Sequence, residues 1–166
     1  MIFHASIAAK DPQHVAEVVG ELWGGEAIEF LPLNNGSWMA VASDDRNTAL
    51  EVYPAGKVLD AEAFMSVADD PEAAANPKPI ETHLAIGSVL SADEVKAIGE
   101  REGWLARPMR RKMGFDVIEL WVENRVMLEV LTDYMQKEYL ESATTPRWHA
   151  AMNAFKEAQA AASKSD

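Results

Sequence analysis

Hydrophobic positions along the chain fall into two stretches that predict the same order of elements. In the first, an apolar run over residues 2–9 predicts a strand, and Asp11 followed by Pro12 is typical of a helix start. The apolar face of that helix has the expected spacing: Val15, Val18, Val19 and Leu22. Gly24 and Gly25 end it, and three strands follow, over residues 27–33, 37–43 and 48–53.

The second stretch repeats this order. Residues 82–88 predict a strand, Ser91 is a suitable cap for a helix that carries Val95 and Ile98, and Gly103 ends that helix. Three more strands are expected, over residues 104–109, 115–122 and 126–131. The pattern therefore predicts an α+β fold of tandem βαβββ modules, over residues 1–56 and 81–133.

Two other segments differ from the modules. Residues 57–80 form a proline-rich and alanine-rich linker, in which Asp60 favours a short helix over residues 61–68. Residues 134–166 are expected to hold a C-terminal helix, beginning at Thr145 and Pro146, and a tail. The apolar face of this helix is predicted to pack on the outside of a sheet: Trp148, Met152 and Phe155.

The modules repeat polar residues as well as elements. His4 and His83 stand on the first strands, and Glu51 and Glu129 stand on the last strands at nearly the same separation. Strand alternation places each histidine among mostly small neighbours, on the face opposite the apolar residues. A single glutamate or histidine on a strand is usually solvated, but four at matched positions of a repeat favour a shared site.

These four side chains offer two imidazoles and two carboxylates. This donor set suits a divalent Ni, Co, Zn, Fe or Mn ion, which would also offset the cost of inward-facing carboxylates. Glu119 leaves the register of the last hairpin open, because one pairing sets it opposite Glu129. We expect the other pairing, in which Leu120 lies opposite Glu129 as Ala40 lies opposite Glu51.

Composition narrows the possible functions. The 166 residues are 48% hydrophobic and carry a net charge of −12. This negative charge disfavours nucleic-acid partners and anionic membrane surfaces. The absence of cysteine excludes disulfides, zinc fingers, iron–sulfur sites and thiol nucleophiles. No apolar run could span a bilayer, and the N-terminus has no pattern of a secretory signal, so a cytoplasmic protein is expected.

The sequence resembles the vicinal oxygen chelate superfamily in its four repeated residues and in the helix end Leu22-Trp23-Gly24-Gly25. This is the fold of glyoxalase I, bleomycin resistance proteins and extradiol dioxygenases, and the glyoxalase I branch is the most similar. The resemblance implies a cupped mixed sheet and a metal held by His4, Glu51, His83 and Glu129. It further implies a lyase or isomerase in which Glu51 or Glu129 moves a proton, a small-molecule substrate and a homodimer.

The resemblance also has a departure and leaves alternatives. The positions at which bacterial glyoxalase I contacts glutathione are Ala8 and Ala55 here, which speaks against glutathione as co-substrate. A small-molecule binding or resistance protein without turnover is one alternative. An extradiol dioxygenase, with two histidines and one glutamate on iron, is the other.

Further candidates surround these four residues. The basic cluster at Arg107, Arg110 and Arg111 is either a clamp for an anionic substrate or a solvated loop. Three aromatic residues are candidates to line a substrate pocket, although they are equally ordinary in a core: Trp38, Tyr53 and Trp121. His14 and His149 are expected to be exposed and without a role.

Overall fold

The structure, a computed structural model, describes residues 2–30, 36–59, 67–72 and 82–162. The elements of the first module are β1 (His4–Ala9), α1 (Pro12–Trp23), β2 (Glu26–Glu29), β3 (Trp38–Val41) and β4 (Ala49–Pro54). Its four-stranded sheet has the order β1-β4-β3-β2, with β1 parallel to β4 and the other neighbours antiparallel. The first and last strands of the module are thus neighbours.

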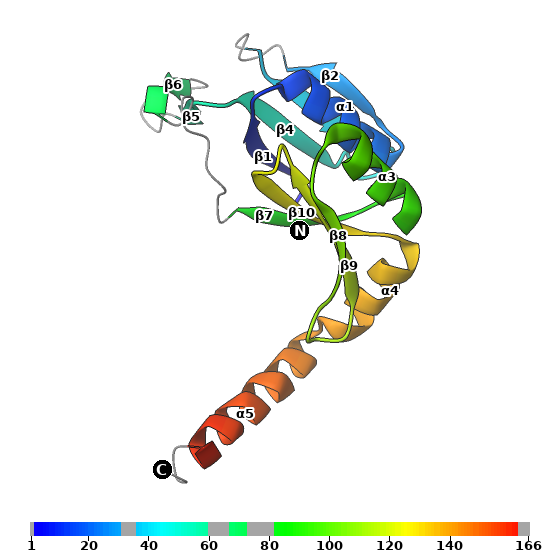
Figure 1. The fold of residues 1–166 in the computed structure, drawn as a ribbon, viewed down its shortest axis with the longest axis vertical. Helices are drawn as coiled ribbons and strands as arrows, with labels where there is room; N and C mark the ends of the chain where they lie inside the picture. The colour runs from blue at the N-terminus through cyan, green and yellow to red at the C-terminus, as the bar shows by residue number, and fades with distance from the viewer. Residues whose placement is uncertain (1, 31–35, 60–66, 73–81, 163–166) are drawn as a thin grey trace.

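The second module repeats this topology. Its elements are β7 (His83–Gly87), α3 (Ala92–Glu102), β8 (Ala106–Arg110), β9 (Asp116–Val122) and β10 (Val126–Leu131). The sheet order is β7-β10-β9-β8, again with the first and last strands parallel. The predicted α+β fold of two βαβββ modules is confirmed, and each module forms its own mixed sheet (Figure 1).

The end of α1 explains the Gly24-Gly25 pair. Gly24 has a φ of 61°, the left-handed conformation that glycine adopts without strain, and its N–H donates to the Glu21 and Gly20 carbonyls. Gly25 lies against β3, where an added Cβ would stand 1.9 Å from the Val41 carbonyl oxygen. Only glycine at position 25 lets the chain turn this closely from the helix into the sheet.

The inward faces of both sheets and their helices form one apolar core. Leu50 and Val52 of β4, and Leu128 and Val130 of β10, are at most 1% exposed. Helices α1 and α3 lie side by side (Figure 1), joined by an ion pair between Arg101 and Glu21.

His14 makes a second contact between these helices, with its Nε2 2.5 Å from Glu102 Oε2. His14 is half-buried and has a structural contact, so the prediction of an exposed residue without a role is wrong for it. His149 is exposed, as predicted.

A loop of the second module contacts the start of the first helix. Glu123, between β9 and β10, accepts hydrogen bonds from the backbone N–H groups of Lys10 and Asp11. Asp11 itself accepts from the His14 N–H at the first turn of α1. The carboxylate of Glu123 therefore stands near the positive end of the helix dipole and links the two modules.

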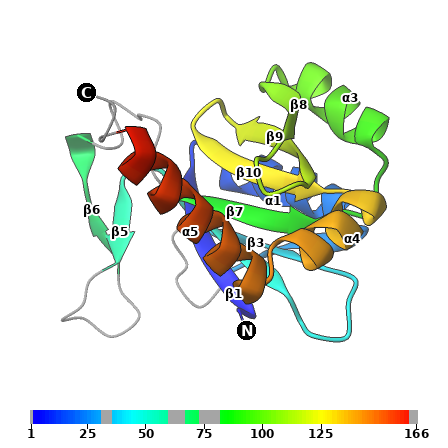
Figure 2. The same ribbon diagram turned by 90° about the horizontal axis from the view of Figure 1, so that it is seen from below.

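Several predicted boundaries differ from the structure. The strand predicted over residues 27–33 is β2, which ends at Glu29, and residues 31–35 lie outside the described residues. Within the linker, β5 (Lys57–Leu59) pairs with β6 (Val67–Asp69). The helix predicted over residues 61–68 is wrong at its last two positions, which belong to β6, and the rest of it lies outside the described residues. Both views show this hairpin standing apart from the main sheets (Figures 1 and 2).

The C-terminal segment contains two helices, α4 (Asp133–Ser142) and α5 (Thr145–Ala162). The predicted helix is α5, but its packing on a sheet is wrong for the described side chains, because Trp148 and Met152 are each 47% exposed. Figure 1 shows α5 projecting away from the body. Its alanine-rich sequence offers little apolar surface, and the shorter α4 packs on the second sheet instead, through Met135. The side chain of Phe155 lies outside the described residues.

No helix in the described ranges combines the length and the apolar character that a membrane span requires.

We predict that Glu123→Ala lowers the free energy of unfolding by about 1 kcal/mol, because two N–H groups at the start of α1 lose their acceptor. Asp45→Ala, in the corresponding loop of the first module, is the control and should change stability by less than about 0.5 kcal/mol. Urea denaturation followed by circular dichroism measures both. Equal effects of the two substitutions would contradict the proposed link between the modules.

Candidate metal centre

The two modules place their histidine and glutamate in the same geometry. His4 pairs with Ala49 across the parallel strands β1 and β4, and His83 pairs with Met127 across β7 and β10. In both cases the partner lies two positions before the glutamate, so the histidine and glutamate share one face of the sheet. We call His4 with Glu51 the first half-site and His83 with Glu129 the second half-site.

The register predicted for the antiparallel neighbours is wrong in both modules. Glu129 lies opposite Glu119 instead of Leu120, and Glu51 lies opposite Met39 instead of Ala40. The physical reason is burial, because partners across antiparallel strands share a face and a shift by one residue exchanges the faces. The observed register buries Leu120 and Ala40 completely in the core, whereas the predicted one would have turned Glu119 inward.

The first half-site lies on an open, largely uncharged surface. His4 is exposed and Glu51 is half-buried, with Met39 beside it on β3. The Tyr53 hydroxyl donates a 2.6 Å hydrogen bond to Glu51 Oε2. Burial and this contact with Glu51 raise the pKa of Tyr53, so the phenol remains a donor to the carboxylate at neutral pH.

The second half-site belongs to an ionic network. Arg111 bridges two glutamates, through Nη1 to Glu119 Oε1 at 2.9 Å and through Nη2 to Glu129 Oε1. Arg107 binds the other oxygen of Glu119 at 2.7 Å. Burial acts to raise the pKa of Glu119, but the hydrogen bonds and charges of the two arginines outweigh it and hold the pKa below its ordinary value.

A cavity of about 440 Å³ adjoins the second half-site. His83 and Glu129 line it. The other lining side chains come from the loop between β8 and β9 and from both C-terminal helices: Arg111, Lys112, Met113, Phe115, Tyr139 and Trp148. The ring of Phe115 packs edge-on against that of Tyr139, with 4.9 Å between their centres. The contribution of α4 and α5 to this cavity was not predicted from the sequence, because Trp148 was expected on a helix face that packs on the outside of a sheet.

The four predicted ligands form two pairs in a single chain. Within the described ranges, which include all four, no three His, Asp or Glu side chains come close enough to hold one metal ion. Each pair offers one imidazole nitrogen and one carboxylate, donors that suit a borderline divalent cation. The carboxylate of the first half-site accepts from the uncharged Tyr53 hydroxyl, whereas the carboxylate of the second is already neutralised by Arg111.

The other predicted site residues are distributed around these pairs. Tyr53 lies on the open face of the first sheet, but Trp38 pairs with Val52 and packs against the core on the opposite face. Trp121 lies on the open face of the second sheet, and its buried Nε1 has no hydrogen-bond partner in the described structure. Arg110 binds Asp116 and Glu138. The basic cluster is therefore engaged with carboxylates of this chain.

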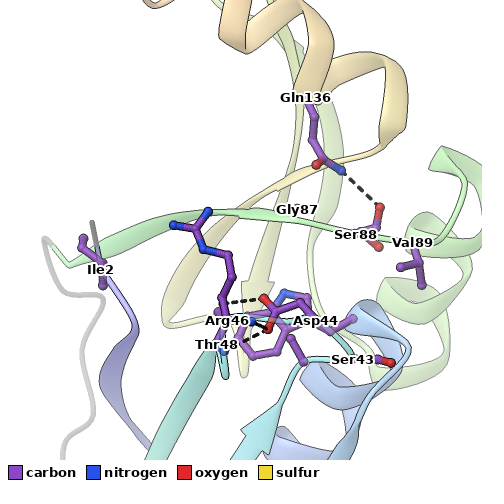
Figure 3. A pocket seen from close by; sticks show the side chains of 11 residues that line it. Ile2, Ser43, Asp44, Arg46, Thr48, Gly87, Ser88, Val89 and Gln136 are labelled. Carbon is purple, nitrogen blue, oxygen red and sulfur yellow. Dashed lines mark hydrogen bonds between the residues drawn. The ribbon is translucent and has the colours of Figure 1, made fainter.

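A second cavity, of about 540 Å³, lies between the modules and contains none of the four predicted ligands. Figure 3 shows Arg46 and Asp44 on one side of it, with Gln136 of α4 bonded to the Ser88 carbonyl on the other. Asp44 is occupied by the Thr48 hydroxyl at 2.6 Å and by backbone N–H groups. The described residues that line this cavity come from both modules and gather no donor set for a metal.

Comparisons with known proteins give one structural neighbour to report. No family model matches the chain, and no curated protein matches it. Among solved structures, the chain is similar to a lactoylglutathione lyase from Agrobacterium tumefaciens, with 18% sequence identity and a TM-score of 0.49. The alignment covers 80% of this chain and 93% of that one.

The lowered pKa of Glu119 makes the ionic network a pH-dependent source of stability. A carboxyl group with a lowered folded-state pKa stabilises the protein above its ordinary pKa of about 4.3, and this contribution is lost as pH falls through the folded-state value. We predict that Glu119→Gln lowers the unfolding free energy at pH 7 by about 1–3 kcal/mol, because both arginines lose a charged partner. The loss stays in this range because Arg107 is half-exposed and its guanidinium can be solvated by water instead.

The difference between wild type and Glu119→Gln should shrink as pH falls below about 4, because the wild-type carboxyl becomes protonated. Urea denaturation at pH 7, 5, 4 and 3 measures it, with Glu26→Gln, an exposed residue of β2, as the control. A difference that stays constant over this range would contradict the network.

Proposed function

We propose that this protein is a glyoxalase-like, metal-dependent lyase or isomerase that acts on a small molecule in the cytoplasm. The observation that carries the proposal is the repeated geometry of the half-sites, in which a histidine and a glutamate share the open face at the same strand register in both modules. A duplicated donor pair of this kind has no role in packing the core. It is what a shared ligand site on the open faces requires.

His4, Glu51, His83 and Glu129 would hold one divalent Ni, Co, Zn, Fe or Mn ion. Because one chain brings these residues together only in pairs, we propose a homodimer in which half-sites of two chains face each other. A bound divalent ion supplies Lewis-acid polarisation of substrate oxygens. The buried Trp121 Nε1, which lacks an acceptor, is a donor that a substrate or a second chain could use.

Proton transfer would fall to a carboxylate of the half-sites, and the contacts favour Glu51 over Glu129. Glu51 has only the Tyr53 hydroxyl as its described hydrogen-bond partner, so one of its oxygens is available to a substrate C–H group. Glu129 is held by Arg111. Tyr53 would orient Glu51 for the transfer and, because its own pKa is raised, keep its proton.

One observation favours a second candidate, a small-molecule binding protein without turnover. The ion pair between Arg111 and Glu129 neutralises the second half-site without any metal. In such a protein the cavity beside His83 and Trp148 would bind the ligand directly. Glutathione is not proposed as co-substrate, because Ala8 and Ala55 provide no contacts for it.

We predict that protein purified without chelator contains about one equivalent of divalent metal per chain. Glu51→Gln should lower the metal affinity by at least about tenfold, because it removes a ligand. Glu29→Gln, on the opposite face of the same sheet, is the matched control and should leave the metal content unchanged. Elemental analysis after dialysis measures all three proteins.

If the protein forms an intact dimer but contains no metal under metal-replete conditions, the enzyme proposal is refuted and the binding protein is favoured. If metal is present, hemithioacetal isomerisation and catechol ring cleavage should be assayed in parallel. Isomerisation with loss of activity in Glu51→Gln supports the proposal. Catechol cleavage that survives Glu51→Gln would instead identify the dioxygenase alternative.

A further inference from the structure

The two half-sites have the same backbone register but different neighbours. In the first sheet, Met39 lies opposite Glu51, and Ile28 of β2 lies opposite Met39. In the second sheet, the matching positions are charged, with Glu119 opposite Glu129 and Arg107 opposite Glu119. The two matched sites therefore differ in their surroundings, which are apolar in the first sheet and ionic in the second.

The charges of the second half-site balance without any external ion. Arg107, Glu119, Arg111 and Glu129 alternate in sign along a continuous chain of ion pairs. The side chains of Glu119 and Glu129 are only 5% and 13% exposed, and burying a carboxylate without a partner is costly. The guanidinium of Arg111 supplies that partner to both.

We propose that Arg111 is a built-in competitor of the metal, which occupies Glu129 in the metal-free protein and must leave it before the second half-site can bind an ion. This inference rests on the proposed metal site. Among the described residues of the first half-site, the hydrogen-bond partner of Glu51 is the uncharged Tyr53 hydroxyl.

The structure provides both a path and an anchor for this movement. Arg111 is 26% exposed and lines the 440 Å³ cavity beside Glu129, so its Nη2 can turn into open space. Its Nη1 contact with Glu119 can persist while the contact with Glu129 breaks. Arg111 thus lowers the fraction of chains whose Glu129 is free, and the apparent metal affinity falls by that fraction.

We predict that Arg111→Met binds Zn²⁺ about tenfold more tightly than the wild type in calorimetric titrations of the full-length protein. Arg110→Met is the matched control, since Arg110 is the adjacent arginine but binds Asp116 and Glu138. It should change the dissociation constant by less than about twofold. Arg111→Lys keeps the positive charge but lacks the guanidinium group that spans two carboxylates. Its Zn²⁺ affinity should lie between those of Arg111→Met and the wild type.

The outcomes separate this inference from the proposed function. Wild-type binding that Arg111→Met does not tighten would overturn the role of Arg111 and leave the metal site standing. Absence of Zn²⁺ binding in every variant, with folding verified by circular dichroism, would overturn both. Binding by Arg111→Met alone would support the competition and identify the wild type as a metal-free binding protein. If Arg111→Met does not fold, Arg111→Lys decides, and equal affinity to the wild type overturns the inference.

Discussion

The parallel pairing of the first and last strand in each module is the constraint on which the rest of this structure depends. It aligns His4 with the residue two before Glu51, and His83 with the residue two before Glu129, so that each imidazole and carboxylate share a face. The opposite face of the same strands carries the residues that form the core. Because the side-chain period of a strand is two, a shift by one residue would expose the core and bury the polar pair. Folding and the candidate chemistry are therefore fixed by the same register.

This constraint also explains why the modules could diverge at their half-sites without losing the fold. Every charged residue of the second network stands on the open face or just beyond β8, whereas the core positions of both sheets remain aliphatic. Placing Glu119 opposite Glu129 brings two like charges together, which is unfavourable unless a cation lies between them. Arg111 is that cation in the described structure. The sheet thus tolerates the pair of glutamates through a side chain of the neighbouring loop.

The order of elements and the face of each candidate ligand could be predicted from the sequence, because both depend on local patterns of apolar residues, caps and glycines. The hairpin register could not, because alternation alone fits either pairing of Glu129 until the burial of Leu120 decides between them. The ionic network was missed for the same reason, since it follows from the register. Helix α4 had a usable signal, with Thr132 before its start and Met135 and Tyr139 on one face. The projecting position of α5 had none, because packing against a sheet depends on tertiary contacts that an apolar stripe does not specify.

The position of α5 connects the C-terminal segment with the second half-site. Trp148 lies at the start of this helix and lines the cavity next to His83 and Glu129, while it remains 47% exposed. A large aromatic side chain that is half in contact with a site and half in solvent has apolar surface left to bury. A second chain that faced the half-sites would cover it together with the open faces of the sheets. The same association that would bring four metal donors together would therefore also bury apolar surface that a single chain leaves in water, and the two effects would stabilise one assembly.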